Sequence, residues 1–233
     1  VSTIERTIRS VDEQSWPSIE HVIVDGKSTD GTLDVLKKYA NRCRIFSESD
    51  EGLYDAMNKG VENATGNFLL FINAGDYLLH ESVIENCARL ISMVTEPVDV
   101  CYGNVLIYNE QTGSASLWAP KQKTRLGLFK SCLPHPATFF SKESFEKNGL
   151  FDTSFRIAGD YEWFIRGMEK NHIRYVHIDT LVTLFNEGGV STHANFRNLH
   201  QQEKDRIYHM HYSHLNRLLF RIGVFFKKNI KFL

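Results

Sequence analysis

The sequence predicts an α/β fold in which a mostly parallel, Rossmann-like sheet is flanked by helices. Two features of residues 1–76 predict it: strand-like and helix-like segments alternate there, and the turns between them are short. A third feature is that Asp25, Asp50 and Asp76 each follow a strand-like segment. Because open α/β sheets bind ligands at the carboxyl ends of their strands, these acids also indicate the edge at which a ligand binds.

The composition fits one ordinary globular domain, alone or with a small appendage. The 233 residues are 42% hydrophobic and 24% charged, and the formal net charge is −1. This balance gives no general reason to expect nucleic-acid binding. The four cysteines lack a CxxC spacing, which is typical of reduced thiols in a cytosolic protein. No run of about 18 apolar residues is present, so we expect a cytoplasmic location.

The first expected element is a helix that runs to about Gln14. Residues 2–5 form a capping-box pattern, and Ile4, Ile8 and Val11 follow at helical spacing. In this class a strand normally precedes such a helix, so we expect roughly ten more residues before Val1. The next expected elements are strand 20–25, turn 26–31, helix 32–39, strand 44–48, helix 53–64 and strand 68–72.

Residues 68–72 are apolar without alternation, which predicts a strand that is covered on both faces. A buried helical segment would look the same over so short a run. However, Gly66 and Gly75 lie on either side of this run, and its length suits a strand better. Its following turn ends at Asp76, which we expect to hold a divalent metal against a diphosphate.

The second half of the chain is less regular. We expect residues 109–134 to form a long polar loop over one face of the fold. The other expected elements are helix 82–94, strands 98–103 and 105–108, strand 137–140, helix 142–148, helix 161–171, strand 174–178, and largely helix from 199 to the end.

One acid at a strand end is weak evidence for a site, because it can simply cap the next helix. For Asp30, capping or turn formation is as good an explanation as ligand binding. Several carboxylates at one sheet edge repel one another, however, unless a cation or a ligand rich in donors lies among them.

Three stretches of the first half resemble the conserved blocks of family 2 glycosyltransferases, whose fold is called GT-A. They are VDGKSTDGT at 24–32, EGLYDAMNKG at 51–60 and GNFLLFINAGD at 66–76. GLFD at 149–152 and AGDYEW at 158–163 resemble the acceptor-side blocks of that family. The similarity extends over most of residues 1–195. It is closest in character to bacterial enzymes that build colanic acid, capsule and O-antigen repeat units.

The resemblance implies a GT-A catalytic domain over residues 1–198, with a nucleotide-sugar-binding half at 1–100 and an acceptor-side half at 101–198. Residues 199–233 would form a helical extension. The implied role of Asp25 is to accept a hydrogen bond from an N–H of the nucleotide base. The further implied nucleotide-sugar contacts are Lys27, Asp30, Asp55, Asn58, Asn73 and Ala74.

The resemblance also assigns the chemistry. Asp76 would be the last acid of a DXD-like motif and would bind Mg²⁺ or Mn²⁺, and Asp160 would be the general base. Two positions depart from the family pattern: Asn73 replaces an acid of the DXD-like motif, and Gly159 replaces the Glu of a Glu-Asp pair. Glu162 is therefore a rival base on the acceptor side, although in a helix it faces another direction from Asp160.

The resemblance implies roles for two histidines. His193 follows Gly188-Gly-Val-Ser-Thr, which resembles a late loop of the family, and the resemblance implies a metal or diphosphate contact there, with an ordinary surface histidine as the simpler alternative. His135 lies between Pro134 and Pro136 in a rigid turn, where the resemblance implies an acceptor-side role.

The carboxyl-terminal residues form an amphipathic pattern. Apolar residues recur at helical spacing from Leu215 to Phe226, and residues 215–233 carry five cations and no acid. Such a helix suits an anionic membrane surface, but packing on the domain or in a homodimer fits equally well. The QxxRW motif of processive synthases is absent, which favours the addition of a single sugar.

The resemblance therefore implies inverting, metal-dependent transfer of one sugar from a nucleotide sugar to a saccharide or lipid-linked acceptor in surface polysaccharide biosynthesis. A nucleotidyltransferase needs a basic Gly-rich loop and a dehydrogenase needs GxGxxG after a strand, and the sequence has neither. A catalytically weak nucleotide-sugar-binding or scaffold protein of the same fold stays open, because of Asn73 and Gly159.

Overall fold

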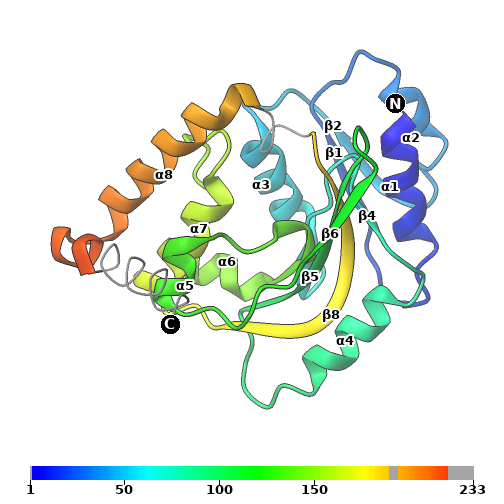
Figure 1. Cartoon of the computed structure of the whole chain (residues 1–233). Coiled ribbons are helices and arrows are strands. Elements are labelled where there is room, and N and C mark those ends of the chain that lie inside the picture. The colour runs from blue at the N-terminus through cyan, green and yellow to red at the C-terminus, as the bar shows by residue number, and fades with distance from the viewer. Residues whose placement is uncertain (1, 189–193, 220–233) are drawn as a thin grey trace.

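The computed structural model describes residues 2–188 and 194–219 and has α-helices on both sides of its strands (Figure 1). The α-helices are α1 (Ser2–Asp12), α2 (Thr32–Lys37), α3 (Leu53–Asn63), α4 (Val83–Ser92), α5 (Arg125–Lys130), α6 (Lys142–Asn148), α7 (Gly159–Glu169) and α8 (Arg197–His211). The strands are β1 (Val22–Asp25), β2 (Arg44–Ser47), β3 (Phe68–Leu70), β4 (Tyr77–Leu78), β5 (Val100–Asn109), β6 (Ser114–Trp118), β7 (Thr138–Ser141) and β8 (Tyr175–Asn186). Two 3₁₀ turns, η1 (His135–Ala137) and η2 (Ala194–Phe196), complete the order.

The strands form two sheets. β1 and β2 pair in parallel, with Asp25 opposite Ser47. The second sheet has the order β3-β7-β5-β8-β4, with β6 paired to β5. The predicted α/β class is confirmed. Parallel pairing, which we expected for most of the sheet, holds for β1–β2 and β5–β8, whereas the other four pairs are antiparallel. For β5 and β6 the reason is the short turn between them, because a hairpin can only be antiparallel.

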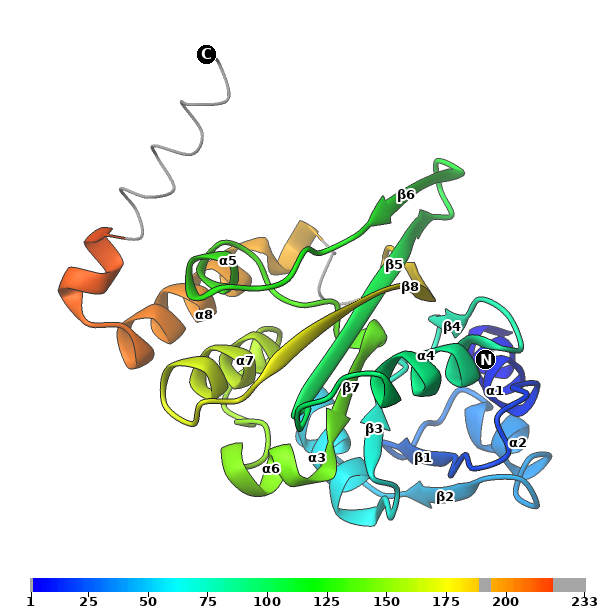
Figure 2. The ribbon, with the colours of Figure 1, turned by 90° about the horizontal axis from the view of Figure 1, so that it is seen from below.

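The hydrophobic core lies on both faces of the second sheet. Along β5, Val100 and Tyr102 belong to the larger cluster, under α3, α6 and α7. Cys101 and Val105 belong to a second cluster with α4. Successive strand residues point to opposite faces, so this alternation makes a sheet with a helical layer on each side (Figure 2).

Several predicted elements need correction. Segment 109–134 is not a continuous loop, because it contains β6 and α5. Strands 98–103 and 105–108 are one strand, β5, which is continuous through a bulge near Gly103. The backbone of β8, which pairs with β5, comes very close at this bulge, since a Cβ at Gly103 would lie 2.7 Å from the carbonyl oxygen of Thr180. Phe68 is 40% exposed, so β3 is not covered on both faces as we expected.

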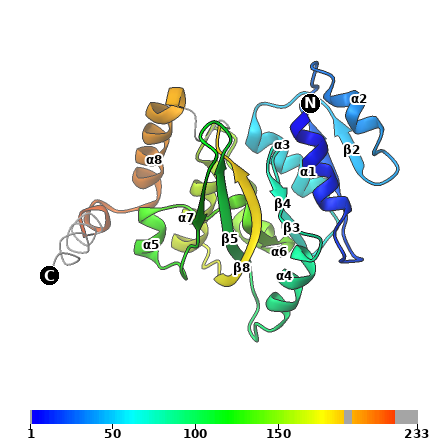
Figure 3. The same cartoon turned by 45° about the vertical axis from the view of Figure 1, so that its right-hand side comes forward.

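The described part of the carboxyl-terminal region packs against the rest of the fold. Ile207 of α8 and Tyr212 are buried in the larger core cluster. α8 and α5 lie at one end of the molecule, while β1, β2 and α2 lie at the other (Figure 3). Within residues 2–188 and 194–219, no helix is long and apolar enough to cross a membrane.

Candidate functional site

The first part of the site is the end of β1, where Asp25 is buried. Its Oδ2 accepts hydrogen bonds from the backbone N–H of Ser28 at 3.1 Å and from the hydroxyl of Ser47 at 2.8 Å. Burial acts to raise the pKa of Asp25, but these hydrogen bonds hold that pKa below its usual value. Asp25 is therefore present as an ordered carboxylate.

A cavity of about 340 Å³ opens beside Asp25. Its walls come from the first turn of α1, from β1 and its following turn, from α2, and from Ala74. Asp25, Asp30 and Ala74 were all predicted as nucleotide-sugar contacts, and the structure places them around this one cavity. Asp30 also accepts a hydrogen bond from the backbone N–H of Thr32 at 3.1 Å, so it shapes the turn as well.

Two other predicted donor-site residues, Asp55 and Asn58, already have polar partners within the protein. Asp55 accepts a hydrogen bond from the backbone N–H of Glu51 and pairs with Lys59 at 3.1 Å. The side-chain amide of Asn58 donates from Nδ2 to the carbonyl of Phe151 and accepts at Oδ1 from the N–H of Phe151, each at 2.9 Å. This bond pair joins α3 to the segment before α7, and the sugar contact of Asn58 stays a prediction.

Lys27 lies in the turn after β1, with a positive φ of 57°. This is the left-handed region, which a lysine adopts less readily than a glycine. Lys27 is not among the residues that line the cavity. The sequence therefore placed it in the correct turn, and its contact with a nucleotide stays a prediction.

The second part of the site is the turn at 73–76. Gly75 has φ +111°, which favours glycine, and the N–H of Asp76 donates to the carbonyl of Asn73 at 3.0 Å. The hydroxyl of Thr7 accepts from the N–H of Gly75 at 3.1 Å and donates to the carbonyl of Asp76 at 2.7 Å. Helix α1 thus holds the turn in place.

The Asp76 side chain is 4% exposed. It accepts a hydrogen bond from the N–H of Asn186, at the end of β8, at 3.1 Å. Burial raises the pKa of Asp76 to about 7, and the bond from Asn186 acts in the opposite direction. One hydrogen bond compensates little of the charge of a buried carboxylate. A bound cation would therefore stabilise the charged form of Asp76.

The remaining ligands of such a cation cannot all be protein side chains of the described region. Within residues 2–188 and 194–219, no group of three or more His, Cys, Asp or Glu residues is placed to hold a metal. His193, which we predicted as a further ligand, lies outside the described residues. Asp76 therefore fits a metal that takes most of its ligands from a bound diphosphate and water.

The third part of the site is Asp160, in the first turn of α7. Its Oδ1 accepts from the N–H of Tyr161 at 2.8 Å and lies 3.0 Å from the hydroxyl of Tyr54. Its Oδ2 lies 3.6 Å from Nδ1 of His135 and 3.8 Å from Sγ of Cys132. Sequence reasoning missed Tyr54 and Cys132. Tyr54 lies inside the family-like block at 51–60, which was the available signal, whereas no pattern marked Cys132.

His135 connects this carboxylate to the turn at 73–76. Its Nε2 lies 3.0 Å from Nδ2 of Asn73. Burial lowers the pKa of His135, against the opposing effect of the Asp160 charge, which favours a neutral ring. A neutral ring can accept from the Asn73 amide at Nε2 and direct its Nδ1–H towards Asp160. The structure thus brings together Asn73, His135 and Asp160, all three of which the sequence had singled out.

Glu162 lies elsewhere. Its side chain is 2% exposed, accepts a hydrogen bond from Nε of Arg166 at 3.0 Å and lies 2.8 Å from Nε2 of His211. Burial acts to raise the pKa of Glu162, but His211 and Arg166 hold that pKa below its usual value. Glu162 is therefore an internal ion-pair partner, which argues against a role as rival base, and its acceptor-side role stays a prediction.

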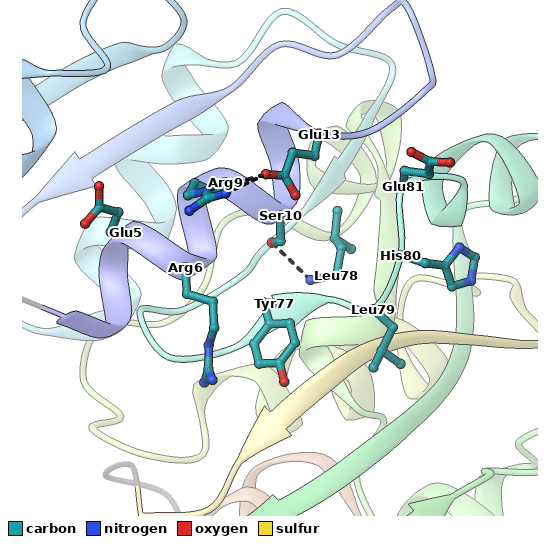
Figure 4. A pocket seen from close by; sticks show the side chains of 10 residues that line it. All are labelled: Glu5, Arg6, Arg9, Ser10, Glu13, Tyr77, Leu78, Leu79, His80 and Glu81. Carbon is teal, nitrogen blue, oxygen red and sulfur yellow. Dashed lines mark hydrogen bonds and ion pairs between the residues drawn. The ribbon is translucent and has the colours of Figure 1, made fainter.

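A larger groove, of about 510 Å³, runs between α1 and the β4 region (Figure 4). The guanidinium of Arg6 lies 4.2 Å from the centre of the Tyr77 ring, and Arg9 pairs with Glu13 at 3.3 Å. No predicted site residue lines this groove, so we assign it no part in the site.

Comparison with known proteins gives a consistent picture. A family model described as glycosyl transferase family 2 matches residues 1–149. A Mycobacterium bovis protein named "PGL/p-HBAD biosynthesis glycosyltransferase" is 34% identical over 189 residues, which are 78% of this chain and 71% of that protein. A Methanococcus voltae protein is 24% identical over 200 residues, which are 76% of this chain and 61% of that protein. Its name is "Dolichyl N-acetyl-alpha-D-glucosaminyl phosphate 3-beta-D-2,3-diacetamido-2,3-dideoxy-beta-D-glucuronosyltransferase".

Among solved structures, the chain is similar to S. aureus TarS in complex with UDP-GlcNAc. The TM-score is 0.66 at 19% identity, and the match covers 82% of this chain. The chain spans 56% of the length of that TarS chain. At this identity the likeness concerns the fold alone.

Proposed function

Because this chain belongs to glycosyltransferase family 2, we propose that it transfers one sugar from a nucleoside diphosphate sugar to a saccharide or lipid-linked saccharide, with inversion. The predicted GT-A fold and glycosyltransferase class are confirmed by the family match and by the likeness to TarS. One observation carries the finer proposal: His135 bridges Asn73, on the turn of Asp76, to Asp160. A single side chain, His135, therefore spans the distance between the donor-side turn and the candidate base.

In this proposal the nucleotide occupies the cavity beside Asp25. The Asp25 carboxylate accepts a hydrogen bond from the base, and the diphosphate extends past Ala74 towards Asp76. The cavity walls contain Asp25, Asp30 and Ala74, which supports this path. TarS, solved with UDP-GlcNAc, offers a precedent for a nucleotide sugar on this fold.

Asp76 would hold Mg²⁺ or Mn²⁺ against the diphosphate, and His193 is proposed as a further ligand. When bound, the divalent ion neutralises the charge that develops on the leaving diphosphate. The buried position of Asp76 supports this assignment, because its single described hydrogen bond leaves most of its charge uncompensated.

Asp160 is the proposed general base. A sugar hydroxyl is a poor nucleophile, so a carboxylate within hydrogen-bond reach must take its proton as the new bond forms. The acceptor oxygen bonds to the anomeric carbon while the bond to the diphosphate oxygen breaks, and the anomeric carbon gains oxocarbenium character. Attack opposite the leaving group inverts the configuration, so an α-linked donor gives a β-linked product.

The acceptor is proposed to belong to a surface polysaccharide, such as a capsule or colanic-acid-type polymer, or to a glycolipid. The name of the M. voltae relative contains a dolichyl phosphate sugar, which supports a lipid-linked acceptor. Residues 214–219 are helical and expose Leu215, Leu218 and Leu219. The proposed location is the cytoplasm, with peripheral contact at the inner face of the cytoplasmic membrane, and the exposed leucines support that contact.

The proposal is tested by thermal shift with a panel of nucleoside diphosphates, with and without Mn²⁺, followed by donor-hydrolysis assays. Stabilisation by one nucleoside diphosphate, increased by Mn²⁺, is expected from linkage. Hydrolysis of the matching nucleotide sugar should then be lost in Asp160→Asn. Binding without any turnover would favour the scaffold alternative, and neither binding nor turnover would overturn the proposal.

A further inference from the structure

We propose that Tyr54 is a positioning residue for Asp160, and that its hydroxyl holds Oδ1 so that Oδ2 is the oxygen that takes the acceptor proton. The inference rests on the proposed function, because it assigns Asp160 as the general base. It deepens that function by naming which oxygen reacts and which side chain orients it.

The geometry joins two distant parts of the chain. Tyr54 lies in the first turn of α3, 106 residues before Asp160 in the sequence. Its hydroxyl lies 3.0 Å from Oδ1 of Asp160 and 2.6 Å from the carbonyl oxygen of Ile157. Its ring is buried and packs against Phe151, with the ring centres 5.8 Å apart. The hydroxyl has one proton, which the two acceptors share, with the shorter contact to Ile157. The packing of the ring fixes the position of the hydroxyl between them.

The hydroxyl also stays protonated. Burial, together with the nearby charge of Asp160, raises the pKa of Tyr54 well above its usual value. A protonated phenol can donate towards a carboxylate, whereas a phenolate would repel it. Tyr54 therefore acts as a neutral donor throughout the working pH range of an enzyme.

The ring of Tyr54 packs directly against Gly159. A Cβ placed on Gly159 would lie 2.7 to 2.9 Å from three atoms of the Tyr54 ring. No side chain fits at residue 159 while the ring stays where it is. Gly159 is the position at which the family pattern has a Glu beside the base. The ring of Tyr54 fills the space where that side chain would begin, and its hydroxyl supplies a polar contact to Asp160.

The two oxygens of Asp160 are consequently unequal. Oδ1 has two close polar neighbours, the N–H of Tyr161 and the hydroxyl of Tyr54. Among the described residues, Oδ2 has only the longer contacts to Cys132 and His135, at 3.8 and 3.6 Å. Donors at Oδ1 fix the plane of the carboxylate. The lone pairs of Oδ2 remain available for the acceptor hydroxyl.

The test is Tyr54→Phe, which keeps the ring against Gly159 and removes only the hydroxyl. Of the two close polar neighbours of Oδ1, only the N–H of Tyr161 then remains, so the carboxylate loses part of its orientation. We expect kcat to fall about tenfold, on the scale of one hydrogen bond to a charged group. KM for the donor should stay within about twofold of the wild type.

Tyr175→Phe is the matched control, because Tyr175 is also buried and its hydroxyl donates to the carbonyl of Phe164. It removes one buried hydroxyl away from Asp160, so its kcat should stay within about twofold of the wild type. An equal loss of kcat in both variants would mean that general destabilisation causes the effect, and it would overturn the inference.

A second readout does not depend on turnover. The ¹³C resonance of the Asp160 carboxyl can be assigned by its loss in Asp160→Asn, and its chemical shift at neutral pH should change in Tyr54→Phe but not in Tyr175→Phe. Normal activity with an unchanged chemical shift would overturn the positioning role and leave the proposed function intact. Failure of the wild-type protein to bind any nucleoside diphosphate or to turn over any donor would overturn both.

Discussion

Three carboxylates show how their partners determine what an acid does in this molecule. Glu162 is buried with Arg166 and His211, so its charge is compensated inside the fold. Asp76 is equally buried but has one described hydrogen bond. Asp160 has one oxygen held and the other with only long contacts. These differences suit a structural ion pair, a cation ligand and a base, respectively.

For Asp76, removing the charge should separate function from stability. Asp76→Asn keeps the shape of the side chain but removes an undercompensated buried charge, so the metal-free protein should become more stable by roughly 1 kcal/mol. The same variant should lose the additional stabilisation that Mn²⁺ gives in the presence of a nucleoside diphosphate. Thermal melts with and without both ligands measure the two effects. Unchanged Mn²⁺-dependent stabilisation would remove Asp76 from the metal site.

For Glu162, the prediction is destabilisation without a catalytic defect. Breaking a buried ion pair costs about 3–5 kcal/mol, so Glu162→Gln should lose about that much free energy of unfolding at pH 7. Its kcat, per folded molecule, should stay near that of the wild type, whereas Asp160→Asn should show the opposite pattern. Urea unfolding and donor hydrolysis on both variants measure this. A catalytic loss in Glu162→Gln that matches the loss in Asp160→Asn would restore Glu162 as a candidate base.

The pH dependence of the Glu162 effect follows from its lowered pKa. A carboxyl whose folded pKa lies below its unfolded pKa contributes stability that is fully present above the unfolded value, here 4.5. That contribution is lost as the pH falls through the folded pKa. The difference in unfolding free energy between wild type and Glu162→Gln should therefore shrink below about pH 4.5. A constant difference down to pH 3.5 would contradict this origin.

At the scale of elements, the sequence predicted the helices that local apolar spacing and capping residues mark. Helix α6 was predicted with the bounds that the structure shows, and α1, α3 and α4 within about two residues, because apolar spacing and caps are local features. β6 was missed because its residues are mostly exposed and lack β-branched side chains, so it exists through its pairing with β5. The link from Asn73 through His135 to Asp160 was also beyond local patterns, since it joins segments 62 and 25 residues apart.

One element contact makes a prediction of its own. Glu203 of α8 accepts three backbone hydrogen bonds, from the N–H groups of Arg156, Ile157 and Ala158, at 2.7 to 3.0 Å. This segment leads directly into α7 and Asp160. Glu203→Ala should destabilise the protein by about 3 kcal/mol, because buried N–H groups lose their partner, and it should lower kcat by displacing Asp160.

The control for Glu203 is Asp205→Ala, on the exposed face of the same helix. Its effect on unfolding should stay within about 0.5 kcal/mol. Urea unfolding and donor hydrolysis compare the two variants. A Glu203→Ala protein with full activity once folded would show that α8 supports stability alone.

At the scale of the whole molecule, the two ends differ in chemistry. The end with β1, β2 and α2 carries the cavity beside Asp25, and the opposite end carries α8 and residues 214–219 (Figures 1 and 3). Asp160 is linked to the donor side through His135, which contacts Asn73 on the turn of Asp76. It is linked to α8 through the backbone segment 156–158, whose N–H groups donate to Glu203. This arrangement would let a membrane-bound acceptor approach from the α8 end while a soluble donor binds at the other.

The exposed leucines of residues 214–219 allow this arrangement to be tested. Leu215, Leu218 and Leu219 are 62%, 49% and 52% exposed and share one face of the helical segment. Residues 215–233 carry five cations and no acid, which complements an anionic surface. The chain should therefore co-sediment with vesicles that contain phosphatidylglycerol, and much less with pure phosphatidylcholine. Replacing the three leucines by serine should weaken binding about 100-fold, at roughly 1 kcal/mol for each half-buried leucine.

Leu117→Ser is the matched control for that experiment. Leu117 is also 62% exposed but lies on β6, so vesicle binding should not change. Raising the salt concentration should weaken binding of the wild type, because surface electrostatic attraction is screened. If the leucines instead form a contact between two copies of the chain, the wild type will sediment as a dimer without vesicles and the triple variant as a monomer. That result, with no difference between the two kinds of vesicle, would replace the membrane by a second subunit.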